Sequence, residues 1–124
     1  MMDDDDDERD EQSTVMQARF DPSVEAVSAF ELEVVEGPDR GRSFRIEIGS
    51  ERVLLGQGPS CAVRLTDPSV SRRHASLEQR DGRVLLTDLG SKNGTRVEQV
   101  PVVGAWLRGG ERVSLSATTL VVHA

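Results

Sequence analysis

The chain has 124 residues and a formal net charge of −7, a length that allows one domain with a single modest core. Residues 1–12 hold eight acidic residues against Arg9, so this stretch carries the whole net charge and residues 13–124 sum to zero. A neutral body has no net basic face to release counterions from a phosphate backbone, which excludes direct binding of DNA or RNA as the expected function.

Nothing in the sequence marks the chain for secretion or for a membrane. Cys61 is the only cysteine and cannot form an internal disulfide, and the N-terminus is an aspartate run instead of a basic stretch followed by an apolar one. The longest apolar runs fall far short of the roughly 20 residues that span a bilayer. No pair of histidines or cysteines has metal-ligand spacing. We therefore expect a cytoplasmic protein with no metal, no cofactor and no membrane partner.

The chain opens with an acidic segment and a linker, residues 1–29. Asp3–Glu11 repel one another and include no apolar residue, so this segment cannot offset the entropy of ordering and is predicted to be disordered. Residues 13–29 follow neither a helical nor an alternating pattern. Ser13 and Thr14 directly follow an acidic stretch, which some kinases favour, and are candidate phosphorylation sites. Phosphorylated Thr14 is then a candidate ligand for the chain's own domain, the alternative being a tail that only aids solubility.

Residues 30–124 read as short strands separated by turns, and we assign them to one domain. Phe30–Val34 and Phe44–Ile48 alternate apolar and polar side chains, so that one set would face a core and the other water. Glycine and proline within residues 36–41 favour a reversal between them. Asp81-Gly82 is the strongest hairpin signal. The further predicted strands are Arg52–Leu55, Ala62–Leu65, Ala75–Gln79, Arg83–Asp88, Thr95–Val97, Val100–Val103, Arg112–Leu115 and Thr119–His123.

The sequence therefore predicts an all-β fold. No stretch after residue 30 keeps a helical apolar stripe for about ten residues, and many short strands with frequent turns are typical of a sandwich or barrel. We predict two packed antiparallel sheets. Trp106 and Phe44 are expected in the core, and Cys61 is expected to be a small buried apolar residue.

Three loop segments between the predicted strands carry the functional signal: Gly56–Ser60, Pro68–His74 and Asp88–Thr95. The second contains Ser-x-x-His and the third reads Asp-x-x-Ser-x-Asn-Gly-Thr. In this order, after a glycine that ends a strand, they resemble the signature of the forkhead-associated (FHA) family. Leu107–Val113 resembles the family's closing region, so the resemblance covers about residues 30–124. It implies an FHA/SMAD-like β-sandwich whose loops bind phosphothreonine peptides at one end.

The resemblance also implies which residues bind the phosphopeptide. Ser71 matches the serine whose hydroxyl donates to phosphate, and the adjacent Arg72 offers a planar, charged fork of donors. Asn93 matches the asparagine that hydrogen-bonds the peptide backbone. Lys92 stands where the family often has a hydroxyl residue, so an ammonium would act there as a point charge. A phosphate dianion prefers this mixture of charged, hydroxyl and amide donors.

Four further matching residues are expected to support the loops. Gly56 matches the glycine that ends the strand before the first loop. His74 matches a histidine that braces the loop carrying the serine. Gly94 relieves the steric penalty of a left-handed turn, and Thr95 helps to hold the third loop in place.

The chain departs from the family at Gln57. The family's arginine at this position is its usual main phosphate anchor, and glutamine brings no charge. Losing a charge-assisted hydrogen bond costs on the order of 1.5 to 3 kcal/mol, or about one to two powers of ten in affinity. Arg72 is the expected replacement, with Lys92 or Arg64 as further candidates.

The resemblance implies a non-enzymatic adaptor that couples a Ser/Thr kinase to another bacterial protein. Because FHA modules often stand at the front of larger regulators, including transcription activators, we expect the chain to be the N-terminal regulatory domain of such a regulator. The alternative is a phosphate-independent interaction or oligomerisation module, which Gln57 favours. An enzymatic interpretation rests only on Ser71 with His74 three residues later, and no orienting acid or oxyanion site accompanies them.

Overall fold

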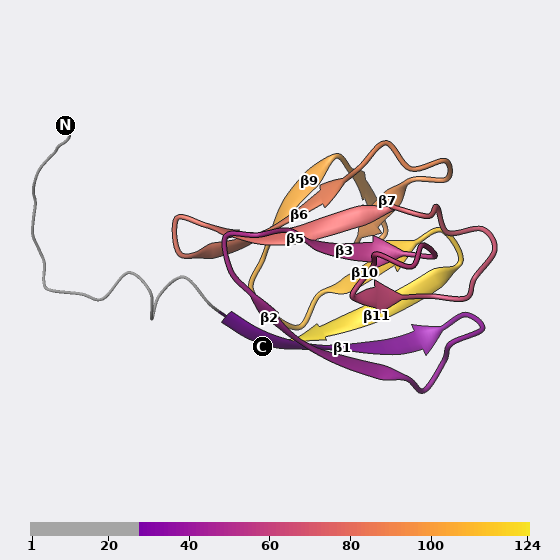
Figure 1. Ribbon diagram of the computed structural model, residues 1–124, viewed down its shortest axis with the longest axis horizontal. Coiled ribbons are helices and arrows are strands. Elements are labelled where there is room, and N and C mark those ends of the chain that lie inside the picture. The colour runs from indigo at the N-terminus through magenta and orange to yellow at the C-terminus, as the bar shows by residue number, and fades with distance from the viewer. Residues whose placement is uncertain (1–27) are drawn as a thin grey trace, which may run out of the picture.

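The computed structural model of the chain describes residues 28–124, which form a sandwich of two β-sheets (Figure 1). One sheet has six strands in the order β2-β1-β11-β10-β7-β8, and the other has five in the order β4-β3-β5-β6-β9. The predicted all-β sandwich is confirmed. The strands are β1 (Ser28–Glu36), β2 (Ser43–Ile48), β3 (Val53–Gly56), β4 (Val63–Arg64), β5 (Ala75–Arg80), β6 (Arg83–Asp88), β7 (Thr95–Val97), β8 (Val100–Val102), β9 (Gly104–Leu107), β10 (Arg112–Leu115) and β11 (Thr118–His123).

The core lies between the two sheets because alternate side chains of each strand point inward. In β2, Ile46 and Ile48 are buried while Arg45 and Glu47 are exposed, which is the alternation seen in the sequence. The same alternation runs through β1 and β10, whereas the first four residues of β5 are all buried. The core residues are Phe30, Leu32, Val34, Ile46, Ile48, Leu55, Val63, Leu65, Val70, Ala75, Leu77, Val84, Leu86, Leu107, Val113, Leu115, Leu120 and Val122.

Two predicted hairpins are present. β1 and β2 pair antiparallel across the turn that contains Gly37 and Pro38, and β5 pairs with β6 across Asp81 and Gly82. Asp81 and Gly82 have φ angles of 53° and 74°, so both central residues of the turn are left-handed. Aspartate and glycine tolerate this conformation better than other residues, which is why this dipeptide closes a two-residue turn.

The prediction for the segment after β8 was wrong in two respects. β9 was not expected, because Gly104 and the exposed Trp106 break the alternating pattern, and the strand exists through its pairing with β6. Trp106 is 43% exposed and does not belong to the core. Its ring lies 4.0 Å below the Arg83 guanidinium, a cation–π contact that covers one face of the indole at the surface.

The predictions for Cys61, for Phe44 and for strand direction were confirmed only in part. Cys61 is buried, as predicted. Phe44 is only partly buried and packs against the edge of the core. The predicted antiparallel pairing holds except for β3 and the two-residue β4, which run parallel.

The loops that carry the motif residues gather at one end of the sandwich. The β1–β2 turn, the β3–β4 and β4–β5 loops, the β6–β7 loop and the β10–β11 turn all lie at this end, whereas residue 28 and the C-terminus lie at the other (Figure 1). Asp3–Glu11 and residues 13–27, including Ser13 and Thr14, lie outside the described residues. Within residues 28–124, no helical segment has the length and apolarity needed to cross a bilayer.

Candidate functional site

Gly56 and the residues after it form the support on which the Ser71 loop rests. The main-chain N–H groups of Gln57 and Gly58 donate to the carbonyl oxygens of Ser71 and Arg72 at 3.1 and 2.9 Å. A Cβ on Gly56 would lie 2.4 Å from the Arg72 carbonyl oxygen and 2.6 Å from that of Ser71. Only glycine at the end of β3 lets the two main chains approach this closely.

His74 links the Ser71 loop to the β6–β7 loop. Its side chain is fully buried, its Nδ1 accepts a hydrogen bond from the Ser71 N–H at 3.0 Å, and its Nε2 lies 2.8 Å from the Gly94 carbonyl oxygen. Because Nδ1 is an acceptor, the ring proton is on Nε2 and is donated to Gly94. Both ring nitrogens are therefore engaged by main-chain groups, and neither is left to take a proton from the Ser71 hydroxyl.

Ser71, Lys92 and Asn93 come together where the two loops meet. The Ser71 hydroxyl accepts a hydrogen bond from the Lys92 main-chain N–H at 3.0 Å, which leaves the hydroxyl proton available to an incoming oxygen. The Asn93 side-chain nitrogen donates to the Ser69 carbonyl oxygen at 2.8 Å and keeps a second N–H. The side chains of Lys92 and Asn93 are exposed, as is that of Arg72, so the cluster offers donors of three kinds to solvent.

Asp88 organises the β6–β7 loop from the end of β6. Its carboxylate accepts hydrogen bonds from the hydroxyls of Ser91 and Thr95, both at 2.6 Å, and from the N–H groups of Gly90 and Ser91. Burial would raise the pKa of Asp88, but these hydrogen bonds favour the charged form and hold the pKa below its ordinary value. Asp88 belongs to the loop motif in the sequence, where it had no predicted role.

Asp67 plays a similar part in the β4–β5 loop. One carboxylate oxygen accepts from the N–H and hydroxyl of Ser69, a local turn that aspartate commonly makes. The other accepts from the Thr118 hydroxyl at 2.7 Å and so ties the loop to β11. Burial raises the pKa of Asp67, yet the bonds from Ser69 and Thr118 outweigh it and lower the pKa. In the sequence, only the turn-forming Asp-Pro-Ser stretch indicated a role for Asp67.

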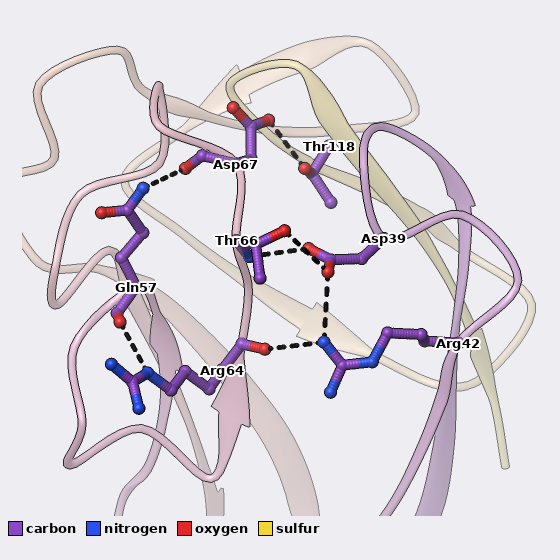
Figure 2. Close-up of polar contacts among 7 residues, drawn as sticks. All are labelled: Asp39, Arg42, Gln57, Arg64, Thr66, Asp67 and Thr118. Atoms are coloured by element: carbon purple, nitrogen blue, oxygen red, sulfur yellow. Dashed lines mark hydrogen bonds and ion pairs between the residues drawn. The ribbon is translucent and has the colours of Figure 1, made fainter.

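Gln57 forms hydrogen bonds at three points, and Figure 2 shows those with Asp67 and Arg64. Its side-chain Nε2 donates to the Asp67 carbonyl oxygen at 2.6 Å, and its own carbonyl oxygen accepts from Nε of Arg64 at 2.9 Å. Its main-chain N–H donates to Ser71. The half-buried side chain therefore braces the β4–β5 loop, and one of its two amide N–H donors is used by a main-chain oxygen.

A second polar group joins the β1–β2 turn to the segment after β4 (Figure 2). The buried Asp39 accepts hydrogen bonds from the N–H and hydroxyl of Thr66 at 2.7 and 2.9 Å, and pairs with Arg42 at 3.1 Å. Burial alone would raise the pKa of Asp39, but the hydrogen bonds from Thr66 and Arg42 outweigh this effect and hold the pKa below its ordinary value. Asp39 looked like an ordinary turn residue in the sequence, because its partner Thr66 is 27 positions away.

The structure thus brings the predicted phosphopeptide-binding and loop-supporting residues into one cluster. Ser71, Arg72, Lys92 and Asn93 present donors to solvent, whereas Gln57 faces Asp67. Gly56, His74, Gly94 and Thr95 lie beneath them, with Thr95 buried and bonded to Asp88. In residues 28–124, no group of three or more His, Cys, Asp or Glu side chains is arranged to hold a metal ion.

Comparisons with known proteins agree on one family. The family model described as "Inner membrane component of T3SS, cytoplasmic domain", an FHA-type domain, matches residues 33–124. The glycogen accumulation regulator GarA of Mycolicibacterium smegmatis is 36% identical over 90 residues, which cover 73% of this chain and 56% of GarA. The chain thus spans little more than half the length of that relative.

Solved structures give the same assignment. A domain from a structural and functional analysis of phosphothreonine-dependent FHA domain interactions has a TM-score of 0.69 and 30% identity, covering 78% of this chain and 97% of that one. The FHA domain of FhaA, crystallised with the intracellular domain of Rv3910, has a TM-score of 0.67 and 31% identity, covering 76% and 99%. With its two-sheet fold, its loop motifs and these relatives, the chain belongs to the forkhead-associated family.

Proposed function

We propose that this FHA domain binds phosphothreonine-containing proteins through the loop cluster of Ser71, Arg72, Lys92 and Asn93. The observation that carries the proposal is the Ser71 hydroxyl, which accepts from the Lys92 N–H and so keeps its own proton for a phosphate oxygen. The phosphothreonine dependence of an FHA relative with 30% identity supports it.

Each member of the cluster has a separate task in this proposal. Ser71 donates its hydroxyl proton to a phosphate oxygen, and Arg72 supplies the guanidinium that compensates the phosphate charge. Lys92 adds a point charge on the neighbouring loop. Asn93, held by Ser69, uses its remaining amide hydrogen and oxygen to bind the peptide main chain. His74 keeps the two loops in register by bonding to both.

Calorimetry with matched phosphorylated and unphosphorylated threonine peptides from a library tests the proposal. We expect binding only to the phosphorylated form, and a loss of roughly ten- to a hundredfold in affinity for Ser71→Ala, because one hydrogen bond to a charged group disappears. Ser50→Ala, an exposed serine in the β2–β3 loop at the opposite end, should bind like the wild type. Equal affinity for phosphorylated and unphosphorylated peptides would refute phosphate recognition.

A second candidate function, a phosphate-independent interaction module, is favoured by the bond between Gln57 and Asp67. That bond occupies the side chain at the family's anchoring position. Gln57→Arg decides between the two functions. If the site recognises phosphate, the added guanidinium should tighten phosphopeptide binding by about tenfold or more. If phosphopeptides bind only after this substitution, the natural site is phosphate-independent. If the Gln57→Arg variant binds phosphopeptides with the same affinity as the wild type, the phosphate lies away from residue 57.

The proposed partners follow from the ligand. A bacterial Ser/Thr kinase would create the phosphothreonine, and the domain would couple that kinase to another protein, as a regulatory part of a longer polypeptide. The chain's own Thr14, once phosphorylated, is a further candidate ligand, since a tether raises the effective concentration to about millimolar.

A further inference from the structure

An open hollow of about 420 Å³ lies between the β1–β2 turn and β4, beside the loop cluster. Arg42, Gln57, Arg64, Leu65 and Thr66 line it. In Figure 2, Arg42 extends from the β1–β2 hairpin toward the Arg64 carbonyl oxygen, whereas the Arg64 guanidinium extends from β4 toward Gln57. We call it the Arg42–Arg64 hollow. Two arginines on its walls give it a positive character. Neither is among the proposed phosphate ligands, although the sequence offered Arg64 as a further candidate for that role.

Arg64 is the stronger cation of the two. Its Nε donates to the neutral carbonyl oxygen of Gln57, and among residues 28–124 no carboxylate forms an ion pair with it. The side chain is exposed, and the two terminal nitrogens of its guanidinium keep their donors. A planar guanidinium with free donors and uncompensated charge prefers a carboxylate or a phosphate as its partner.

Arg42 contributes less because its charge is partly compensated. It pairs with the buried Asp39 at 3.1 Å and lies over the Phe44 ring at 4.7 Å. Both oxygens of Asp39 are engaged, one by the Thr66 N–H and the other by the Thr66 hydroxyl and Arg42. An anion in the hollow would therefore lie nearer to Arg64 than to Asp39, with Arg42 adding a weaker attraction.

The hollow is close enough to the phosphate cluster for one peptide to reach both. The Gln57 N–H donates to the Ser71 carbonyl oxygen at 3.1 Å, and the Gln57 carbonyl oxygen accepts from Arg64 at 2.9 Å. Only the main chain of Gln57 therefore separates Arg64 from Ser71. Arg64 Nε is consequently at most about 10 Å from the Ser71 carbonyl oxygen, which an extended peptide spans in about three residues.

The pKa of the Cys61 thiol is affected by the same group of positive charges. Burial raises the pKa of Cys61, and the charges of Arg73, Arg64 and Arg72 oppose that effect. The guanidinium of Arg64 thus acts on the same loop as the arginine that we assign to the phosphate.

We propose that the Arg42–Arg64 hollow is a second anion subsite, which binds an acidic side chain of the same phosphopeptide within about four residues of the phosphothreonine. This inference rests on the proposed function. The acidic group is a carboxylate or a second phosphate, since a guanidinium fork accepts either. The subsite would select partners that carry an acidic residue near the phosphothreonine.

Calorimetry with three sets of phosphothreonine peptides tests the subsite. One set has alanine at all flanking positions, a second moves a single glutamate up to about four residues to either side, and a third moves a phosphoserine in the same way. At one position we expect glutamate to tighten binding by about fivefold. A larger gain for phosphoserine at that position would identify a doubly phosphorylated peptide as the preferred ligand. The gain should shrink as salt is raised.

Arg64→Ala should abolish this gain while leaving the affinity of the alanine-flanked phosphopeptide unchanged. Arg45→Ala, which removes the same charge from the exposed face of β2, is the matched control and should keep the gain. Two results would overturn the subsite alone: no acidic position that tightens binding, or an equal loss by Arg64→Ala for every peptide, which would assign Arg64 to the first phosphate. Failure of all phosphopeptides to bind would overturn the proposed function and the subsite together.

Discussion

Asp88→Asn should destabilise the folded domain by roughly 2 to 3 kcal/mol at neutral pH. The carboxylate accepts four hydrogen bonds, two from hydroxyls and two from main-chain N–H groups. An amide of the same shape must turn its NH₂ group toward some of these donors, which leaves them without an acceptor. Urea denaturation of the wild type and the variant measures the difference. Asp81→Asn, in the exposed β5–β6 turn, should change stability by no more than about 0.5 kcal/mol.

The pH dependence of that difference identifies its cause. The folded-state pKa of Asp88 lies below its ordinary value of 3.8, so the carboxylate stabilises the fold at every pH above that value. This stabilisation is lost as the pH falls through the lowered folded-state pKa. The gap between wild type and Asp88→Asn should therefore be largest near neutral pH and shrink below about pH 4. A gap that stays constant down to strongly acidic pH would mean that packing, and not the charge, causes the loss.

Gly56→Ala should weaken both stability and phosphopeptide binding. The new methyl group would lie 2.4 and 2.6 Å from the carbonyl oxygens of Arg72 and Ser71, so the main chain of that loop has to move. Overpacking of this kind costs roughly 1 to 3 kcal/mol, and here it also displaces the proposed phosphate ligands. Thermal denaturation and phosphopeptide titration of the folded variant measure the two effects.

Gly104→Ala in β9 is the matched control for Gly56→Ala. A methyl group there would lie 3.3 Å from the Leu86 carbonyl oxygen, a milder contact in the edge strand of the same sheet. We expect a small loss of stability and unchanged binding. If Gly56→Ala binds as tightly as Gly104→Ala, the close approach at the end of β3 has no part in ligand recognition.

Local patterns accounted for most of the fold. The alternation in β1 and β2 and the Asp81-Gly82 turn depend on neighbouring residues alone, so they could be predicted directly. β9 could not, since it has little pattern of its own and is held by pairing with β6. Trp106 was misplaced because an indole can also be covered by an arginine at the surface.

In the candidate site, too, some residues could be predicted from the sequence and others could not. The motif residues were identified by their order along the chain, but the groups that hold the loops together were not. Asp67 reaches Thr118 across 51 positions, and Asp39 reaches Thr66 across 27. Such contacts depend on how the two sheets place distant loops next to one another. The bond from Gln57 to the Asp67 main chain likewise had no signal in the sequence.

The position of the termini sets a minimum linker length for any ligand on the same polypeptide. Residue 28 and the C-terminus lie at the end of the sandwich away from the loops (Figure 1). The nine residues of β1 alone span about 30 Å between the two ends, so a returning segment needs roughly nine or more extended residues. Thr14 is 14 residues before Ser28, which exceeds this minimum. A phosphothreonine fewer than about nine residues before Ser28 would have to bind to a second molecule.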